Sequence, residues 1–121
     1  FRKSTSYSSI INECIFCKII RNEIPSTIIA ESEQVLVIKD INPKAPVHYL
    51  IIPKKHIKDI REFHESDRHI AGDILFMARQ LANDLPEPGD FKLVSNNGPS
   101  SGQCVFHSHF HFLSGKKVID I

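Results

Sequence analysis

The order of apolar and polar positions predicts one short helix near the start of the chain and one long helix in its middle. In residues 67–85 the apolar side chains recur every three or four positions, which is typical of an amphipathic helix with Ser66 or Asp67 as its N-cap. Residues 14–20 show the same spacing over one or two turns, and Pro25 ends that helix. The buried face of the long helix should consist of Ile70, Ile74, Met77, Ala78 and Leu81.

Five stretches rich in β-branched and apolar residues predict strands. The first two are separated by a short polar run, which is typical of a hairpin. The third is largely apolar and ends at Pro53, because proline cannot donate to a strand ladder. This order of elements predicts an α+β domain around an antiparallel sheet. The expected strands are residues 27–30, 35–38, 48–52, 91–95 and 105–113, with a turn at 40–43 and a loop at 96–102.

The composition fits a single folded unit. Of the 121 residues, 41% are hydrophobic and 24% are charged, values close to those of ordinary globular proteins. We expect residues 12–121 to form one domain, preceded by a flexible tail at residues 1–11. A net charge of +1 provides no field that would attract nucleic acid or an anionic membrane. No apolar run approaches the roughly 20 residues of a membrane-spanning helix.

The three cysteines indicate a reducing compartment. Their number is odd, and Cys14 and Cys17 are separated by only two residues, a pattern that suits such a compartment better than a disulfide framework does. The expected location is therefore the cytoplasm. Residues 1–9 are rich in serine, with Arg2 and Lys3 and no acidic residue, which weakly resembles the remnant of an organellar targeting segment. A disordered or trimmed terminus has the same composition.

Three histidines alternate with other residues towards the end of the chain. On a strand, His107, His109 and His111 would project from one face, and the residues between them from the other. Burying three imidazoles in a plain core would need three separate hydrogen-bond partners, so the pattern indicates metal binding or phosphate chemistry instead. The preceding residues 96–104 add glycines and closely spaced backbone N–H groups that suit a phosphate, although an ordinary loop between strands has the same composition.

Residues 102–113 resemble the histidine triad (HIT) signature, in which three alternating histidines are followed by apolar residues. The similarity extends through residues 14–25, 40–43 and 45–56, and it is to the Hint branch of that family, over nearly all of residues 14–115. Members of that branch are homodimers with a five-stranded antiparallel sheet in each subunit, and they hydrolyse purine nucleoside 5′-phosphoramidates and acyl-adenylates. The resemblance implies a HIT-like α+β fold with one long and one short helix. It also implies a sheet that extends across a homodimer, and a purine nucleotide such as AMP or GMP as ligand.

The resemblance further implies a role for each matching residue. His109 would attack the α-phosphorus and form a nucleotidyl-histidine intermediate, so that cleavage of a P–N bond would need no cofactor. His48 would accept a hydrogen bond that orients His109, and His107 would complete the catalytic set. Cys104 stands where the family usually has a serine that donates to the leaving group, and a thiol is a weaker donor. The phosphoryl oxygens would be held by Asn96, Gly102, Gln103, Cys104 and His111.

The base and ribose would occupy an apolar slot. Asp40 matches the carboxylate that binds the ribose hydroxyls in the family. Residues 116–121 lack the Trp-Pro-Pro-Gly ending of many Hint proteins, which shapes the site across the dimer, so substrate selectivity stays open. The slot would be lined by Ile15, Phe16, Ile19, Ile38, Ile41 and Leu50, which are equally good core residues.

Two cysteines and two histidines form a candidate zinc site, namely Cys14, Cys17, His56 and His107. Two thiolates and two imidazoles make a closed tetrahedral set, which would be structural and would leave catalysis to His109. Some bacterial members of the family carry zinc on matching residues. The alternative is a pair of free thiols that act as small buried hydrophobic side chains.

Other functions are compatible with the same motifs. A dinucleoside polyphosphate hydrolase of the Fhit-like branch shares the triad. A nucleotide-responsive protein-binding module with residual activity would fit the change at Cys104. A zinc-dependent interaction domain would depend on the cysteines, would lose its fold on chelation and would have no hydrolytic activity.

Overall fold

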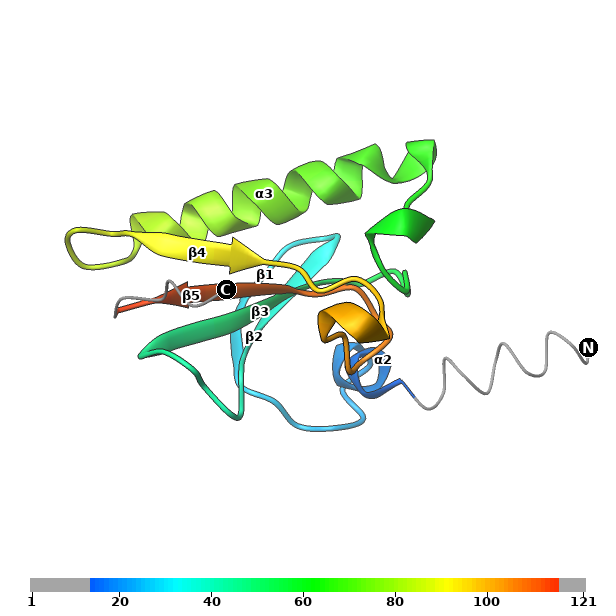
Figure 1. The fold of residues 1–121 in the computed structure, drawn as a ribbon, viewed down its shortest axis with the longest axis horizontal. Helices are drawn as coiled ribbons and strands as arrows, with labels where there is room; N and C mark the ends of the chain where they lie inside the picture. Colours follow the sequence, from blue (N-terminus) through cyan, green and yellow to red (C-terminus); the bar gives the residue numbers. More distant parts are fainter. Residues whose placement is uncertain (1–13, 116–121) are drawn as a thin grey trace, which may run out of the picture.

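The computed structural model describes residues 14–115, which form a five-stranded antiparallel sheet with helices packed against it (Figure 1). The strand order is β1-β2-β3-β5-β4, so that β5 lies between β3 and the edge strand β4. The α+β architecture expected from the sequence is confirmed, whereas residues 1–11 and 116–121, where a tail and a divergent ending were noted, lie outside the described residues. The elements are α2 (Ile15–Ile20), β1 (Ile28–Glu31), β2 (Val35–Lys39), β3 (Val47–Pro53), α3 (Arg68–Asn83), β4 (Phe91–Val94) and β5 (Phe110–Ser114), with 3-10 turns at Ile60–Glu62, Glu65–Asp67 and Pro99–Ser101.

Alternation along the central strands separates two apolar cores, one on each face of the sheet. Val37 of β2 lies opposite Ile51 of β3, and both belong to the core beneath α3. Their neighbours Ile38 and Leu50 also form a pair, and they belong to the core beneath α2. Because side chains on a strand alternate between faces, a single run of apolar residues supplies both cores.

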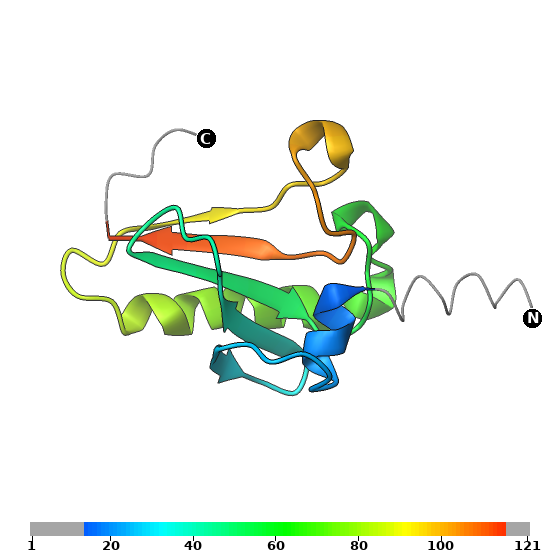
Figure 2. The same ribbon diagram turned by 90° about the horizontal axis from the view of Figure 1, so that it is seen from below.

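Helix α3 runs along one face of the sheet (Figures 1 and 2). Its buried residues are the five that the spacing predicts, so this prediction is confirmed. The helix starts one residue after Asp67, whose carboxylate accepts hydrogen bonds from the His64 backbone N–H at 2.9 Å and from Lys55 Nζ at 2.8 Å. It ends at Asn83, two residues earlier than expected. Within residues 14–115, no helix is long and apolar enough to cross a membrane.

The last strand begins later than the sequence predicts. The expectation of a strand from residue 105 is wrong, because β5 starts at Phe110. The pairing of Ile51 with Phe110 would place Ser108 opposite Pro53, which has no N–H to continue the ladder. The Ser108 N–H instead donates to the Ile57 carbonyl oxygen at 2.6 Å. Only His111 of the triad therefore lies on a strand, and the positions of the other two depend on individual hydrogen bonds.

Candidate functional site

A cavity of about 1030 Å³ opens on the α2 side of the sheet. Its walls are α2, the segment from β2 to the start of β3, the site face of β5 and the loop that precedes β5. Lys44, Ser101 and Val105 also line the cavity but were not predicted from the sequence. Their position beside the recognised motifs is the only feature of the sequence that could have identified them. The expected site residues that line the cavity are Ile15, Phe16, Ile19, Ile38, Asp40, Ile41, His48, Leu50, Asn96, Cys104, His109 and His111.

His109 presents one free ring nitrogen on the wall of this cavity. The residue is 9% exposed, and its Nδ1 lies 2.8 Å from the carbonyl oxygen of His107. Because a carbonyl oxygen can only accept, Nδ1 carries the proton and Nε2 keeps its lone pair. Burial lowers the pKa of His109, so the ring is neutral at pH 7. A neutral imidazole nitrogen with a lone pair and a fixed tautomer is chemically able to act as a nucleophile.

His48 and His111 form a second pair of imidazoles. The Lys44 backbone N–H donates to His48 Nδ1 at 3.0 Å, so the proton of His48 is on Nε2. That Nε2 lies 2.9 Å from His111 Nδ1 and 3.3 Å from Asp40 Oδ2. His111 Nδ1 therefore accepts, which leaves the His111 proton on Nε2. Burial, and then the neighbouring His109 and His48, lower the pKa of His111 to about 4.

This pairing corrects one expectation from the family resemblance. His48 was expected to accept a hydrogen bond that orients His109, but it is hydrogen-bonded to His111 instead. The carbonyl of His107 orients His109. His109 precedes β5, which starts only at Phe110, and its Nδ1 is hydrogen-bonded to a carbonyl oxygen two residues away in its own segment.

The buried side chain of Gln103 stabilises the loop between β4 and β5 through hydrogen bonds to the backbone. Its side chain is 4% exposed and lies outside the cavity lining. Oε1 accepts from the Gly98 N–H at 2.7 Å, while Nε2 donates to the carbonyl oxygens of Lys58 at 2.7 Å and Val105 at 3.0 Å. Gly102, where φ is +102°, passes so close to Asn96 that an added Cβ would lie 3.3 Å from its Nδ2. Gly102 and Gln103 therefore shape the loop, and neither residue lines the cavity.

The loop offers fewer free N–H groups than its composition suggests. The N–H groups of Gly98, Ser101, Gly102 and Gln103 all donate within the loop. Those of Cys104 and Val105 have no partner among residues 14–115. Both of the latter residues line the cavity, so the donors available to an anion lie next to the triad rather than at the glycines.

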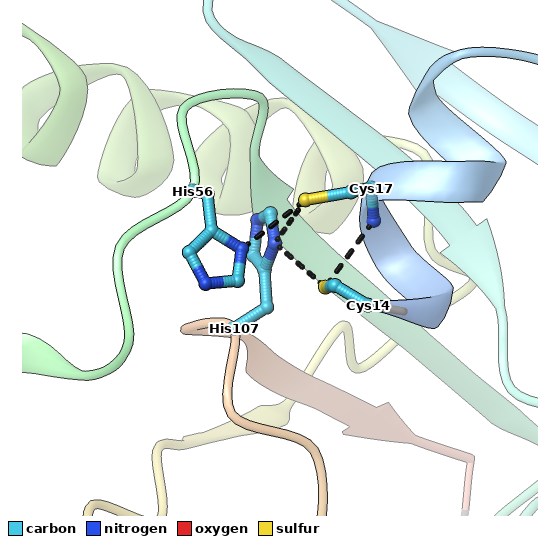
Figure 3. Close-up of side chains that lie close together, drawn as sticks. All are labelled: Cys14, Cys17, His56 and His107. Atoms are coloured by element: carbon cyan, nitrogen blue, oxygen red, sulfur yellow. Dashed lines mark hydrogen bonds between the residues drawn. The ribbon is translucent and has the colours of Figure 1, made fainter. Parts of the chain in front are cut away.

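The candidate zinc ligands meet beside α2, where the chain leaves β3 and where it approaches β5 (Figure 3). His107 Nδ1 lies 3.4 Å from Cys14 Sγ and 3.5 Å from Cys17 Sγ, and His56 Nδ1 lies 3.1 Å from Cys17 Sγ. His107 Nε2 donates to the Pro53 carbonyl oxygen at 2.7 Å, so that its Nδ1 lone pair points at the thiols. A backbone carbonyl that fixes the tautomer in this way is typical of metal-binding histidines.

The charge states of this cluster fit a metal that binds thiolates. Burial lowers the pKa of His107 to about 4 and also lowers the pKa of His56, so both imidazoles are neutral ligands at pH 7. Burial and the neighbouring Cys14 raise the pKa of the Cys17 thiol to about 12. A bound dication would favour the thiolates and displace their protons. The four donors are those of a closed zinc site.

A second cluster, Asp40, His48 and His111, also brings three candidate ligand atoms together. Its tautomers fit a cation poorly. His48 Nε2 carries a proton because Nδ1 already accepts from Lys44, so Nε2 can offer a lone pair only if that hydrogen bond is lost. Of the two clusters, only the one with the cysteines presents a free imidazole lone pair.

Three comparisons relate the chain to known proteins. Residues 13–120 match the family model described as scavenger mRNA decapping enzyme C-term binding. An uncharacterised HIT-like protein of Synechocystis is 45% identical over 86% of this chain and 91% of its own length. A 14 kDa zinc-binding protein of Zea mays is 43% identical, with 86% of this chain and 83% of that protein covered. The solved structure of a HIT family hydrolase from Clostridium thermocellum is 48% identical, has a TM-score of 0.84, and covers 90% of this chain and 96% of that one.

Proposed function

The chain belongs to the histidine triad (HIT) family, and from that premise we propose that it is a nucleotide-binding hydrolase of the Hint type. Its substrates would be purine nucleoside 5′-phosphoramidates or acyl-adenylates. One observation carries the proposal. His109 is buried and neutral, its Nδ1 donates to a backbone carbonyl, and its Nε2 has no hydrogen-bond partner among residues 14–115 and lies on a large cavity. A plain core histidine has no such free nitrogen.

The reaction would proceed in two displacements at the α-phosphorus. His109 Nε2 forms a bond to phosphorus while the P–N bond breaks and the amine leaves with a proton. The imidazole then carries a positive charge, which the His107 carbonyl stabilises at Nδ1–H. Water attacks the nucleotidyl-histidine next, releasing AMP and a proton and restoring the Nε2 lone pair.

Donors around His109 would stabilise the negative charge on the phosphoryl oxygens. We assign this role to His111 Nε2–H and to the backbone N–H groups of Cys104 and Val105, because all three residues line the cavity and the two N–H groups are unpaired within residues 14–115. Each well-placed donor contributes about 10²–10³ in rate. The Cys104 thiol is exposed and would supply the proton to the departing amine.

The nucleoside would occupy the part of the cavity next to α2. Asp40 would bind the ribose hydroxyls, and Phe16, Ile19, Ile38 and Leu50 supply an apolar surface for a purine. Ile41 is 89% exposed, so a base could cover it on binding. Burying that much apolar surface is favourable in proportion to the area removed from water.

A dinucleoside polyphosphate hydrolase is the second candidate. The cavity of about 1030 Å³ is at the upper end of the size range of ligand sites, which leaves room beyond a single nucleotide. The family model that matches residues 13–120 is named for an mRNA decapping enzyme, which also fits a substrate other than a phosphoramidate. Both candidates use His109 as nucleophile and differ in the leaving group.

We also propose that Cys14, Cys17, His56 and His107 bind one structural zinc ion. The proposal is supported by the free His107 lone pair and by the zinc-binding relative. With four protein ligands the metal would have no open position, so it would hold the chain together and would not activate water. Zinc content per chain, measured on wild type and on Cys17→Ser, tests it, and an unchanged zinc content in the variant contradicts it.

A homodimer is part of the same proposal. Leu75 and Phe76 of α3 are each 62% exposed, and Phe91 on the edge strand β4 is 41% exposed. Apolar residues beside an unpaired strand edge are typical of an interface that extends a sheet. Light scattering of the purified protein should give twice the chain mass, and a monomer at micromolar concentration would contradict this part.

The first experiment compares the hydrolysis of adenosine 5′-monophosphoramidate and of diadenosine triphosphate. Wild type should cleave the phosphoramidate faster, and His109→Ala should abolish cleavage of both. His69→Ala is the matched control, because His69 is an exposed histidine on α3. A wild type that binds AMP without turnover would instead support a nucleotide-responsive binding module, and an active His109→Ala would exclude the proposed mechanism.

A further inference from the structure

The cysteine–histidine cluster and the nucleotide cavity share parts of the molecule, although they are separate sites. We propose that they are thermodynamically coupled, so that zinc binding tightens nucleotide binding and the nucleotide tightens zinc binding by the same factor. This inference rests on the proposed binding of a nucleotide and of zinc. It assigns the cluster a regulatory effect on the site in addition to a structural one.

His107 is the most direct link between the two sites. Its ring faces the thiols, with Nδ1 3.4 Å from Cys14 Sγ, and its backbone carbonyl oxygen accepts a hydrogen bond from His109 Nδ1–H at 2.8 Å. A metal bound at the ring would fix the backbone that holds His109 in its reactive tautomer. The two sites thus meet at one residue.

Helix α2 is the second link, because its first turn carries both zinc ligands and residues of the cavity wall. Cys14 is its N-cap and Cys17 lies within it, while Phe16 lines the cavity. The Phe16 ring packs edge-on against both His107 and His109, with centroid distances of 5.9 Å and 5.1 Å. Metal binding to the two cysteines would therefore hold Phe16 against the nucleophile.

The segment after β3 is the third link. It contains His56, and the residues after His56 are hydrogen-bonded to the loop that forms the far wall of the cavity. The Lys58 carbonyl accepts from Gln103 Nε2 at 2.7 Å, and the Ile60 N–H donates to Asn97 Oδ1 at 2.8 Å. Anchoring His56 would anchor this loop as well.

The coupling would arise from shared ordering of these three segments. Cys14 and His56 are only half-buried, so without metal the cluster is held by weak thiol–imidazole hydrogen bonds at a partly solvated position. Zinc would replace these with metal–ligand bonds and reduce the freedom of α2, the post-β3 segment and the loop. When a nucleotide binds next, the protein loses less conformational entropy than it would without zinc. This is a source of positive cooperativity without a large structural change.

The test measures both arms of the linkage. AMP affinity is determined by calorimetry on zinc-loaded and on chelator-stripped protein, and zinc affinity by competition with a chromophoric chelator, with and without AMP. We expect zinc to tighten AMP binding by about 5-fold or more, and AMP to tighten zinc binding by the same factor. Affinities equal within about 2-fold in both arms would overturn the coupling.

Two variants of α2 test whether the coupling passes through the Phe16 ring or results from any change in the cavity wall. Phe16→Leu keeps an apolar cavity wall but removes the edge contacts to the histidines, so the coupling factor should fall towards one. Ile19→Val is the matched control, since Ile19 also lines the cavity but is not among the aromatic contacts of the triad, and it should keep the wild-type factor. Equal factors in the two variants would refute the route through Phe16.

The outcomes also separate this inference from the proposals beneath it. If the protein binds no AMP with or without zinc, the proposed nucleotide function and the coupling are both wrong. If it binds no zinc, the proposed zinc site and the coupling are both wrong. Binding of both ligands without mutual effect would remove the coupling alone. Loss of the far-UV circular dichroism signal on chelation would overturn coupling through these three segments. Zinc would then affect AMP binding only because the whole protein unfolds without it.

Discussion

Replacement of Gln103 by alanine should destabilise the protein and displace the loop that carries the candidate anion donors. The side chain is 4% exposed and makes three hydrogen bonds, each to a backbone group. A hydrogen bond of this kind contributes about 1 kcal/mol net, and a backbone group left buried without a partner costs about 1–3 kcal/mol. We therefore expect Gln103→Ala to lower the free energy of unfolding by about 2–4 kcal/mol.

The measurement is urea denaturation followed by far-UV circular dichroism, because the chain has no tryptophan. Gln80→Ala, at an exposed position of α3, is the control and should change the free energy of unfolding by less than about 0.5 kcal/mol. Activity of Gln103→Ala should fall even at temperatures where the variant is fully folded, because Cys104 and Val105 would no longer be held beside His109.

Gln103→Glu gives a sharper test with an isosteric side chain. The glutamate can still accept from the Gly98 N–H, but an ionised carboxylate would face the carbonyl oxygens of Lys58 and Val105, which accept only. At pH 7 this variant should be at least as unstable as Gln103→Ala, and the deficit should shrink in acid, where a protonated carboxyl can donate once. Wild-type stability in Gln103→Glu would refute the assigned hydrogen bonds.

Three further changes test the core, the leaving-group position and the triad. Ile74→Ala removes a side chain of α3 that is 2% exposed in the core between α3 and the sheet, and should cost about 2–5 kcal/mol in denaturant titrations, whereas Gln80→Ala, at an exposed position of the same helix, should cost less than about 0.5 kcal/mol. Cys104→Ser places a stronger donor on the cavity wall, so it should raise the turnover of phosphoramidate without changing AMP affinity, and unchanged turnover would mean that position 104 does not assist the leaving group. Because burial lowers the pKa of His111 from 6.5 to about 4, the unfolded chain binds a proton more readily, and stability should fall as the pH drops from about 6.5 towards 4. Unfolding of His111→Gln at several pH values should show a smaller fall over that window, and an identical pH dependence would contradict this explanation.

The helices and most strands could be predicted from the sequence because their signals are local. The buried face of α3 follows from apolar spacing alone, and β2 and β3 match the expected strands to within one residue at each end. The motif likewise determined most of the residues on the cavity wall. Asp40 and His48 are far from His109 in sequence, yet a resemblance that covers nearly the whole chain assigns all three to one site, and all three line the cavity.

Tertiary contacts decided what the triad histidines do. Their period-two spacing predicts three equivalent side chains on a strand, but Pro53 stops the ladder and β5 starts only at Phe110. Each ring then takes the tautomer that its own partner imposes, namely a carbonyl for His107 and His109, and His48 Nε2–H for His111. The partners of His107 and His111 are distant in sequence, and the His107 carbonyl reaches His109 only because the chain is not a strand there. The sequence alone therefore shows that three imidazoles are present, and only the fold determines which nitrogen of each is free.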